Sequence, residues 1–273
     1  MSILSQHNVK VIGNQAASIV FMHGYGCDQQ VWRHVAPAFA RDHRIVLFDL
    51  LGSAASDGGA FDRHKYASLE GYARDLIDVC RAAGLERPVL VGHSISAMIA
   101  IVAARMEPDL FSRLVLLAPN PCYLKDGDYD GGFTREDIEQ LLDTLDSNFF
   151  SWARMMAPVI MNAPERPELA EELANRFCAM DPRVARHFAR VTFQSDCRHE
   201  LPHVRPPCLV LQCSDDALAP LHVGEYLRGR LPRAELAVMQ ATGHCPHLSS
   251  PQETIELIRH YLASPVHQLE PAL

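Results

Sequence analysis

Residues 89–98 read Val89-Leu90-Val91-Gly92-His93-Ser94-Ile95-Ser96-Ala97-Met98. A short apolar run stops at a glycine, turns through a serine and continues as an alanine-rich apolar segment that is too long for another buried strand. The pattern predicts a strand, a sharp turn and a helix. In such a turn the serine hydroxyl projects from the end of a sheet, beside the free N–H groups of the new helix. Ser94 is therefore a candidate nucleophile with amides beside it that can stabilise an oxyanion.

The match to the nucleophile pattern G-x-S-x-G is incomplete, because position 96 is serine where a second glycine is expected. Glycine is favoured there because the helix backbone passes close to the strand, and serine is small enough to substitute. In the alternative interpretation, Ser94 only caps a helix that follows a buried strand. The five residues alone do not decide between the two.

The composition describes a large acidic domain. The chain has 273 residues, 48% of them hydrophobic, which is enough for the full core of one α/β domain. A formal charge of -8 argues against nucleic acid or an anionic membrane as the main partner. Residues 1–7 lack the basic and apolar regions of a signal peptide, and no apolar run reaches membrane-spanning length. We expect a cytoplasmic protein.

Eight scattered cysteines are expected to be free thiols, since the chain carries no export signal. Two stretches invite a metal hypothesis: Cys208 with Cys213, and His244-Cys245-Pro246-His247. Neither has the spacing of a zinc site. The sequence therefore predicts no metal and no cofactor.

Apolar runs alternate with helical segments in two parts of the chain, 1–118 and 208–273. Strands are predicted at 18–22, 44–49, 89–92, 114–118, 208–213 and 234–239, and helices include 29–40, 69–83, 95–104, 221–231 and 254–262. The segment 9–12, followed by Gly13-Asn14, predicts a hairpin-like opening. Strands that alternate with helices predict an α/β core with a mostly parallel sheet covered on both faces.

Residues 119–207 break this alternation. No convincing strand is found there, and the segment is too long for a plain loop in a compact domain. Helices are predicted instead at 134–148, 149–161, 167–180 and 182–193, the first opening with a near capping box at Thr134-x-x-Asp137. We interpret 119–207 as an all-helical cap inserted between two strands of the core.

Two later strand ends carry the residues that a serine nucleophile needs. Asp216 follows one strand and His244 the next, and the carboxyl ends of parallel strands meet at one edge of a sheet. The order Ser94, Asp216, His244 is the one expected in an α/β-hydrolase. We assign Ser94 as nucleophile, His244 as base and Asp216 as the group that orients His244.

Neighbouring residues leave alternatives. Asp215 is a rival for the acid, and Asp216 itself is compatible with a helix cap. His247 is a rival for the base, three residues beyond His244. His23 and His93 are expected to hold the loop and the turn by hydrogen bonds.

The oxyanion would be bound by two backbone N–H groups. One belongs to Ile95, the residue after the nucleophile, and the other to Tyr25 in the loop His23-Gly24-Tyr25-Gly26 that follows an earlier strand.

Several segments, spread over nearly the whole chain, carry a family resemblance: Gly24-Tyr25-Gly26-Cys27-Asp28-Gln29, Gly92-His93-Ser94-Ile95-Ser96, Pro121-Cys122-Tyr123-Leu124, Gly131-Gly132-Phe133, Arg176-Phe177-Cys178, Phe193-Gln194-Ser195-Asp196 and Gly243-His244-Cys245-Pro246-His247. The chain resembles the α/β-hydrolases that include RsbQ, a bacterial energy-stress regulator, and the plant karrikin and strigolactone receptors. Arg176-Phe177-Cys178 and the segment after Gly243 look closest to the bacterial member, whereas serine at 96 resembles the plant receptors.

The resemblance implies a four-helix, V-shaped cap over an apolar pocket lined by Tyr25, Phe133, Trp152, Met156 and Phe193. It also implies a serine hydrolase for a small apolar ester or lactone, butenolide-like in shape, that serves as a ligand sensor in stress signalling. The implied partner is a PAS-domain phosphatase of the PP2C type that activates a stress sigma factor. The alternatives are a plain metabolic esterase or lactonase without a signalling partner, and a cofactor-free haloperoxidase, lyase or ring-cleavage-product hydrolase.

Overall fold

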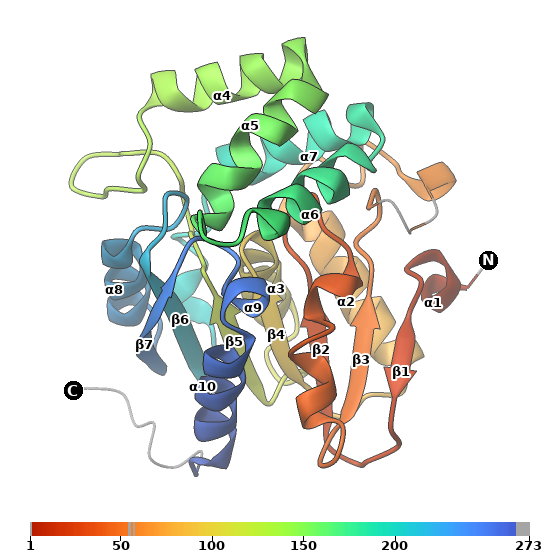
Figure 1. Ribbon diagram of the computed structural model, residues 1–273. Coiled ribbons are helices and arrows are strands. Elements are labelled where there is room, and N and C mark those ends of the chain that lie inside the picture. The colour runs from red at the N-terminus through yellow and green to blue at the C-terminus, as the bar shows by residue number, and fades with distance from the viewer. Residues whose placement is uncertain (1, 54–55, 57, 266–273) are drawn as a thin grey trace.

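The computed structural model of the chain describes residues 2–53, 56 and 58–265. Within these ranges a seven-stranded sheet has the order β1-β3-β2-β4-β5-β6-β7 (Figure 1). β1 pairs antiparallel with β3, and the other strand pairs are parallel. The strands are β1 (Lys10–Ile12), β2 (Ser18–Met22), β3 (Arg44–Phe48), β4 (Val89–His93), β5 (Arg113–Leu117), β6 (Cys208–Asp215) and β7 (Ala234–Thr242). The predicted α/β fold is confirmed.

Helices cover both faces of the sheet. Successive strand residues point to opposite faces, so Val20 and Met22 pack in a different core cluster from Ile19 and Phe21. The first cluster includes side chains of α2 (Leu69–Ala82), α3 (Ile95–Met106) and α8 (Leu221–Arg230). The second includes side chains of the 3-10 helices η1 (Gln29–Trp32) and η2 (Ala36–Phe39) and of α10 (Pro251–Ala263). Shorter elements are α1 (Ile3–Gln6), η3 (Gly58–Ala60), η4 (Leu201–His203) and α9 (Pro246–Ser249).

Four helices follow β5 and precede β6, and we call them the cap: α4 (Arg135–Ser147), α5 (Phe149–Met161), α6 (Pro167–Cys178) and α7 (Pro182–Gln194). They lie over the carboxyl ends of the strands (Figure 1). α4 begins with a complete capping box, in which the Thr134 hydroxyl accepts from the Asp137 amide and the Asp137 carboxylate accepts from the Thr134 amide. The cap therefore covers the edge of the sheet at which Ser94, Asp216 and His244 are expected.

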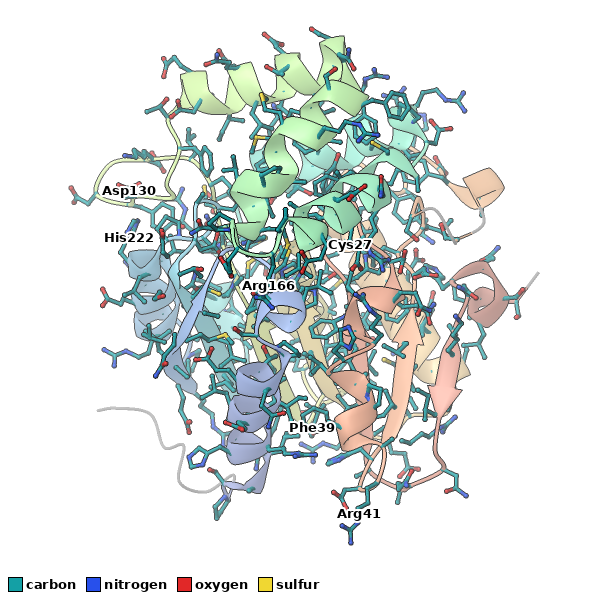
Figure 2. The ribbon with its side chains drawn as sticks, viewed as in Figure 1. Cys27, Phe39, Arg41, Asp130, Arg166 and His222 are labelled. Carbon is teal, nitrogen blue, oxygen red and sulfur yellow. The ribbon has the colours of Figure 1, made fainter. Side chains whose placement is uncertain are left out.

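Two side chains labelled in Figure 2 join the segment between β5 and β6 to the core. His222 on α8 donates from Nε2 to the Asp130 carbonyl oxygen at 2.9 Å. Arg166, just before α6, donates to the Ser249 carbonyl oxygen at 2.7 Å. Ser249 ends α9, the short helix that follows His244. The cap is therefore fastened to the same part of the core that carries His244.

Two predicted elements differ from the structure. Residues 29–40 form two short 3-10 helices instead of one helix, because Pro37 has no backbone N–H and interrupts the hydrogen-bond ladder. The turn at Gly13-Asn14 does not close a hairpin, since β1 pairs with β3 and β2 lies on the other side of β3. Residues 266–273, which we expect from the sequence to form a frayed tail together with Ser264 and Pro265, lie outside the described residues.

No helix within residues 2–53 and 58–265 is long and apolar enough to cross a membrane. Over the same residues, no cluster of three histidine, cysteine or acidic side chains is placed to hold a metal ion.

Candidate active site

Ser94 stands in the sharp turn between β4 and α3. Its backbone angles are φ 57° and ψ -123°, a conformation that non-glycine residues rarely adopt. A Cβ on Gly92 would lie 2.5 Å from the Ser96 carbonyl oxygen, so strand and helix approach too closely for a side chain there. The turn presents the Ser94 side chain above the end of β4, as the strand–turn–helix prediction requires.

Ser96 explains the departure from the glycine pattern. Its side chain is fully buried, and its hydroxyl donates to the His23 carbonyl oxygen in the loop after β2. A glycine at this position would leave that buried carbonyl without this donor. The serine therefore joins the nucleophile turn to the loop that carries Tyr25.

Three side chains from separate strand ends form a continuous hydrogen-bonded chain. Ser94 Oγ lies 2.7 Å from His244 Nε2, and His244 Nδ1 lies 2.7 Å from Asp216 Oδ2. All three residues are buried, with exposed fractions of 5%, 3% and 4% for Ser94, His244 and Asp216. This is the geometry in which an imidazole takes a hydroxyl proton while a carboxylate holds its other nitrogen.

Backbone contacts hold the acid and the base in place. The free oxygen of Asp216, Oδ1, accepts from the amides of Leu218 and Ala219 at 2.8 and 3.1 Å. His93 donates from Nε2 to the His244 carbonyl oxygen, and the His244 amide donates to the Ile160 carbonyl oxygen, both at 2.7 Å. Since Ile160 belongs to α5, the cap itself positions the backbone of His244.

The rival residues lie elsewhere. The Asp215 carboxylate is exposed and accepts from Asn162 Nδ2 at 3.1 Å. His247 is fully buried against the rings of Trp32 and His93, at centroid distances of 4.7 and 4.4 Å. Burial lowers the pKa of His247 to about 3, so its ring is neutral near pH 7. Neither rival takes part in the hydrogen-bonded chain to Ser94.

His23 holds the loop that contains Tyr25. Its Nδ1 donates to the Gly24 carbonyl oxygen at 2.9 Å, and its Nε2 accepts from the Leu50 amide at 3.0 Å. Burial lowers the pKa of His23, which keeps the ring in the neutral form that can both donate and accept. The expectation that His23 and His93 hold backbone in place agrees with these contacts.

The two expected oxyanion donors flank Ser94. Ile95 is the first residue of α3, so its amide has no acceptor within the helix. A Cβ on Gly24 would come within 3.2 Å of the Ser94 Cβ, so the loop before Tyr25 passes directly over the nucleophile. The amides of Tyr25 and Ile95 are therefore compatible with the predicted oxyanion site, and their role stays a prediction.

Comparisons with known proteins agree with this geometry. Residues 19–257 match the model of the alpha/beta hydrolase family. The chain belongs to that family. It is 39% identical over 256 residues to the Karrikin insensitive 2 receptor CA of Petunia hybrida, covering 93% of this chain and 95% of the relative. It is 34% identical to the Strigolactone esterase D14 of Arabidopsis thaliana, covering 96% of this chain and 98% of the relative.

A solved structure supports the same assignment. The structure of a hydrolase from Oleispira antarctica matches with a TM-score of 0.93 and 36% identity, covering 96% of this chain and 97% of that one. Together with relatives that are named esterases, this match supports ester hydrolysis by this α/β-hydrolase. The closer similarity to the bacterial regulator stays a prediction.

The cavity of this hydrolase lies between the cap and the catalytic residues. It is small, about 30 Å³, and mostly apolar. Four of the five expected residues line it: Tyr25, Trp152, Met156 and Phe193. Phe133 does not; its ring packs edge-on against Tyr123, which lines the cavity, at a centroid distance of 6.0 Å. Further lining residues that were not predicted are Cys27, His93, Tyr123, Ile160, Leu173, Phe177, Thr192, Leu218 and Cys245.

Some of these residues carried a signal in the sequence. Tyr123, Cys27 and Phe177 fall in segments that carry the family resemblance, whereas Thr192 and Leu218 fall in no such segment. Burial raises the pKa of Tyr123, which lines the cavity, so its phenol stays protonated.

The two cysteines that line the cavity are poor nucleophiles. Burial raises the pKa of the Cys27 thiol to about 12 and that of the Cys245 thiol well above its usual range. The thiolate is the reactive form of cysteine, and it is scarce at neutral pH under these conditions. Ser94, with His244 beside it, is therefore the nucleophile that the site activates.

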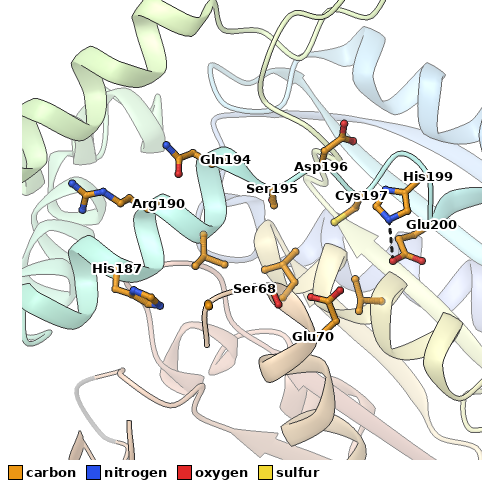
Figure 3. A pocket seen from close by; sticks show the side chains of 14 residues that line it. Ser68, Glu70, His187, Arg190, Gln194, Ser195, Asp196, Cys197, His199 and Glu200 are labelled. Carbon is orange, nitrogen blue, oxygen red and sulfur yellow. Dashed lines mark ion pairs between the residues drawn. The ribbon is translucent and has the colours of Figure 1, made fainter. Parts of the chain in front are cut away.

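A larger hollow, of about 510 Å³, opens beside α7 and the segment after it (Figure 3). Its labelled side chains include Glu70, His187 and Arg190, and an ion pair of 3.3 Å joins His199 to Glu200. Ser94, Asp216 and His244 do not line it. Size alone therefore does not mark the catalytic cavity, which is defined by the three residues that carry the chemistry.

Proposed function

We propose that this hydrolase cleaves small, mostly apolar carboxylic esters or lactones, butenolide-like in size, with Ser94 as nucleophile. The observation that carries the proposal is the pair of 2.7 Å contacts that link Ser94 Oγ to His244 and His244 to Asp216. The apolar lining of the cavity favours an apolar substrate. The Arabidopsis relative is a strigolactone esterase by name, which supports an ester as the reacting group.

The first half of the reaction forms an acyl-enzyme. Ser94 Oγ attacks the carbonyl carbon while His244 Nε2 takes its proton, and Asp216 stabilises the imidazolium that results. The carbonyl oxygen becomes an oxyanion, and the amides of Tyr25 and Ile95 donate to it. His244 then passes the proton to the leaving oxygen. In a lactone, that oxygen stays tethered to the acyl group.

The second half releases the acid. Water attacks the acyl-enzyme carbonyl, and His244 takes a proton from it by the same geometry. The tetrahedral intermediate collapses with Ser94 Oγ as the leaving group, which recovers the proton from His244.

The variant Ser94→Ala tests the proposal. We expect it to lower p-nitrophenyl acetate hydrolysis by at least about 10³-fold, and to abolish labelling by a fluorophosphonate probe, because the attacking oxygen is gone. Ser147→Ala, an exposed serine at the end of α4, is the matched control and should keep both activities. Persistent labelling of the Ser94→Ala protein would place the nucleophile elsewhere and refute the assignment.

We propose, as a second candidate function, that the hydrolase serves as a ligand sensor. A cavity of about 30 Å³ holds little more than one or two water molecules, so a ligand of ester size must widen it. Widening the cavity must shift side chains or helices of the cap, and a partner protein can bind the shifted conformation with a different affinity. The identity to the plant receptor supports this role. The same proposal includes a closer similarity to RsbQ than to the plant receptors. It also includes a PAS-domain phosphatase of the PP2C type as the partner protein.

Turnover and partner binding separate the two functions. A sensor should hydrolyse a butenolide slowly, and should bind the PAS-domain phosphatase with an affinity that changes when the butenolide is present. The Ser94→Ala variant separates ligand capture from hydrolysis in this assay. Rapid turnover, together with an affinity for the phosphatase that does not change when the butenolide is added, would contradict the sensor function. The plain esterase would then be the supported function.

A further inference from the structure

Thr192 is a residue of the cavity wall, and its hydroxyl has no role in the reaction described above. It lies on α7, only 2% exposed, and lines the same cavity as Ser94 and His244. Its Oγ1 has no hydrogen-bond partner among the residues that the structure describes. A buried hydroxyl without a partner costs stability, so its presence calls for an explanation.

Other helical threonines of this chain behave differently. Thr144 on α4 donates to the Gln140 carbonyl oxygen at 2.7 Å, and Thr254 on α10 donates to the Ser250 carbonyl oxygen at 3.0 Å. Both use the carbonyl four residues earlier, which is the usual partner of a threonine in a helix. The Thr192 hydroxyl makes no such hydrogen bond to the carbonyl oxygen four residues earlier. Since Thr192 is one of the residues that line the cavity, we take a ligand in the cavity as the missing partner.

The polar atoms around the cavity narrow the kind of ligand atom. Ser94 and His244 are hydrogen-bonded to each other, and the Tyr123 phenol, which burial keeps protonated by raising its pKa, is a further donor beside them. The indole N–H of Trp152, which also lines the cavity, is buried and has no acceptor among the described residues. An indole N–H can only donate, and a hydroxyl can donate as well. His93 also lines the cavity, and its unpartnered Nδ1 can only accept because Nε2 donates to the His244 carbonyl oxygen. An oxygen acceptor on the ligand complements the Thr192 and Trp152 donors, whereas a pure hydrocarbon leaves both donors without a partner.

We propose that Thr192 forms a second polar subsite, which binds an oxygen of the substrate that is not part of the scissile ester. The substrate class is then a small oxygenated ester or lactone, with a carbonyl, ether or hydroxyl oxygen remote from the bond that Ser94 attacks. This inference rests on the proposed hydrolase function and deepens it. Thr192 acts in specificity, because it discriminates between an oxygen and a methylene at one position of the ligand.

Matched pairs of p-nitrophenyl esters test the subsite. Methoxyacetate is compared with butanoate, 3-methoxypropanoate with pentanoate, and 4-oxopentanoate with 4-methylpentanoate. In each pair an oxygen replaces a carbon at a known distance from the scissile carbonyl. For each pair, the ratio of kcat/KM is measured in the wild type, in Thr192→Val and in Thr192→Ser. Comparing the ratio between proteins cancels the intrinsic reactivity of each ester.

We expect Thr192→Val to lower the ratio of oxygenated to hydrocarbon ester by about tenfold for at least one pair, as the loss of one hydrogen bond predicts. Thr192→Ser keeps the hydroxyl and should keep the ratio. The urea unfolding midpoint of Thr192→Val should be no lower than that of the wild type, because valine removes the unpartnered hydroxyl and preserves the shape.

Two results would overturn the subsite. In the first, the ratio in Thr192→Val stays within about twofold of the wild type for every pair; if kcat/KM then falls equally for both members of each pair, Thr192 has a role in shape alone. A lower unfolding midpoint for Thr192→Val would show that the hydroxyl is satisfied within the protein. If the wild type hydrolyses none of the esters and does not react with a fluorophosphonate, the hydrolase function itself fails and the subsite fails with it.

Discussion

At Gly243, the loop that carries the catalytic base His244 packs closely against helix α5 of the cap. The φ of Gly243 is 78°, and a Cβ built on it would lie 2.0 Å from the Met161 carbonyl oxygen of α5. Real Cβ contacts are essentially never closer than 3.0 Å. In Gly243→Ala, the end of α5 and the loop must therefore move apart by about 1 Å. That loop carries His244, whose amide is bonded to the Ile160 carbonyl oxygen at 2.7 Å.

Two costs follow for Gly243→Ala. An alanine held at positive φ costs about 1–2 kcal/mol of stability, and the displaced contact adds to it. A displacement of about 1 Å at a catalytic group costs on the order of 100-fold in rate. We expect kcat for p-nitrophenyl acetate to fall about 100-fold while the protein stays folded, with the free energy of unfolding in urea lower by about 2–4 kcal/mol.

Gly84→Ala is the matched control. Gly84 also has a positive φ, 64°, but a Cβ there meets nothing within 4 Å, and the residue lies beyond the C-terminus of α2. This variant should lose about 1 kcal/mol of stability and keep the wild-type kcat. A folded Gly243→Ala protein with a kcat near that of the wild type would refute the reasoning that the cap positions the base. Equal losses of kcat in both variants would refute it as well.

Two further predictions follow from the site. Asp216→Asn should lower kcat by about 10³–10⁴-fold, because the amide no longer holds the His244 ring in the productive tautomer. The kcat of the control Asp215→Asn should stay within about twofold of the wild type. Steady-state kinetics that show the opposite order would reassign the acid to Asp215. His247 is neutral in the folded protein because burial lowers its pKa to about 3, so below about pH 6.5 the unfolded chain binds a proton that the folded chain does not. Its contribution to stability is thus complete above pH 6.5 and is lost as the pH falls toward 3, at up to about 1.4 kcal/mol per pH unit. His247→Phe, which keeps a ring against Trp32, should make stability fall less steeply in urea unfolding between pH 7 and pH 5, and an unchanged slope would contradict the neutral assignment.

Much of the architecture could be predicted because it depends on local chemistry. The alternation of apolar runs and helical segments predicts the sheet, since a parallel strand must be covered on both faces. The capping box at Thr134 predicts the start of α4, and the glycine and small residues around Ser94 predict the strained turn. Residues 29–40 were predicted wrongly as one helix, because apolar spacing alone does not weigh the missing N–H of Pro37.

The catalytic constellation was predictable as a set of strand ends. The order Ser94, Asp216, His244 and the rule that parallel strands end at one edge bring the three residues together without any knowledge of their side-chain directions. The choice between Asp216 and Asp215, adjacent in the chain, depends on which carboxylate faces His244. Only the tertiary structure decides between them: the Asp216 carboxylate is hydrogen-bonded to His244, and the Asp215 carboxylate is hydrogen-bonded to Asn162.

The sequence by itself determined the fold class, the nucleophile turn and the order of the catalytic residues, because these depend on periodicity, turn chemistry and strand order. The tertiary structure alone decided how closed the cavity is, that Phe133 lies behind its wall, that the Ile160 carbonyl holds the base, and that the Thr192 hydroxyl has no partner among the described residues. Those features arise where α5 and α7 pack against loops distant from them in the chain. Contacts between distant segments depend on helix orientation and side-chain direction, which local sequence patterns do not encode.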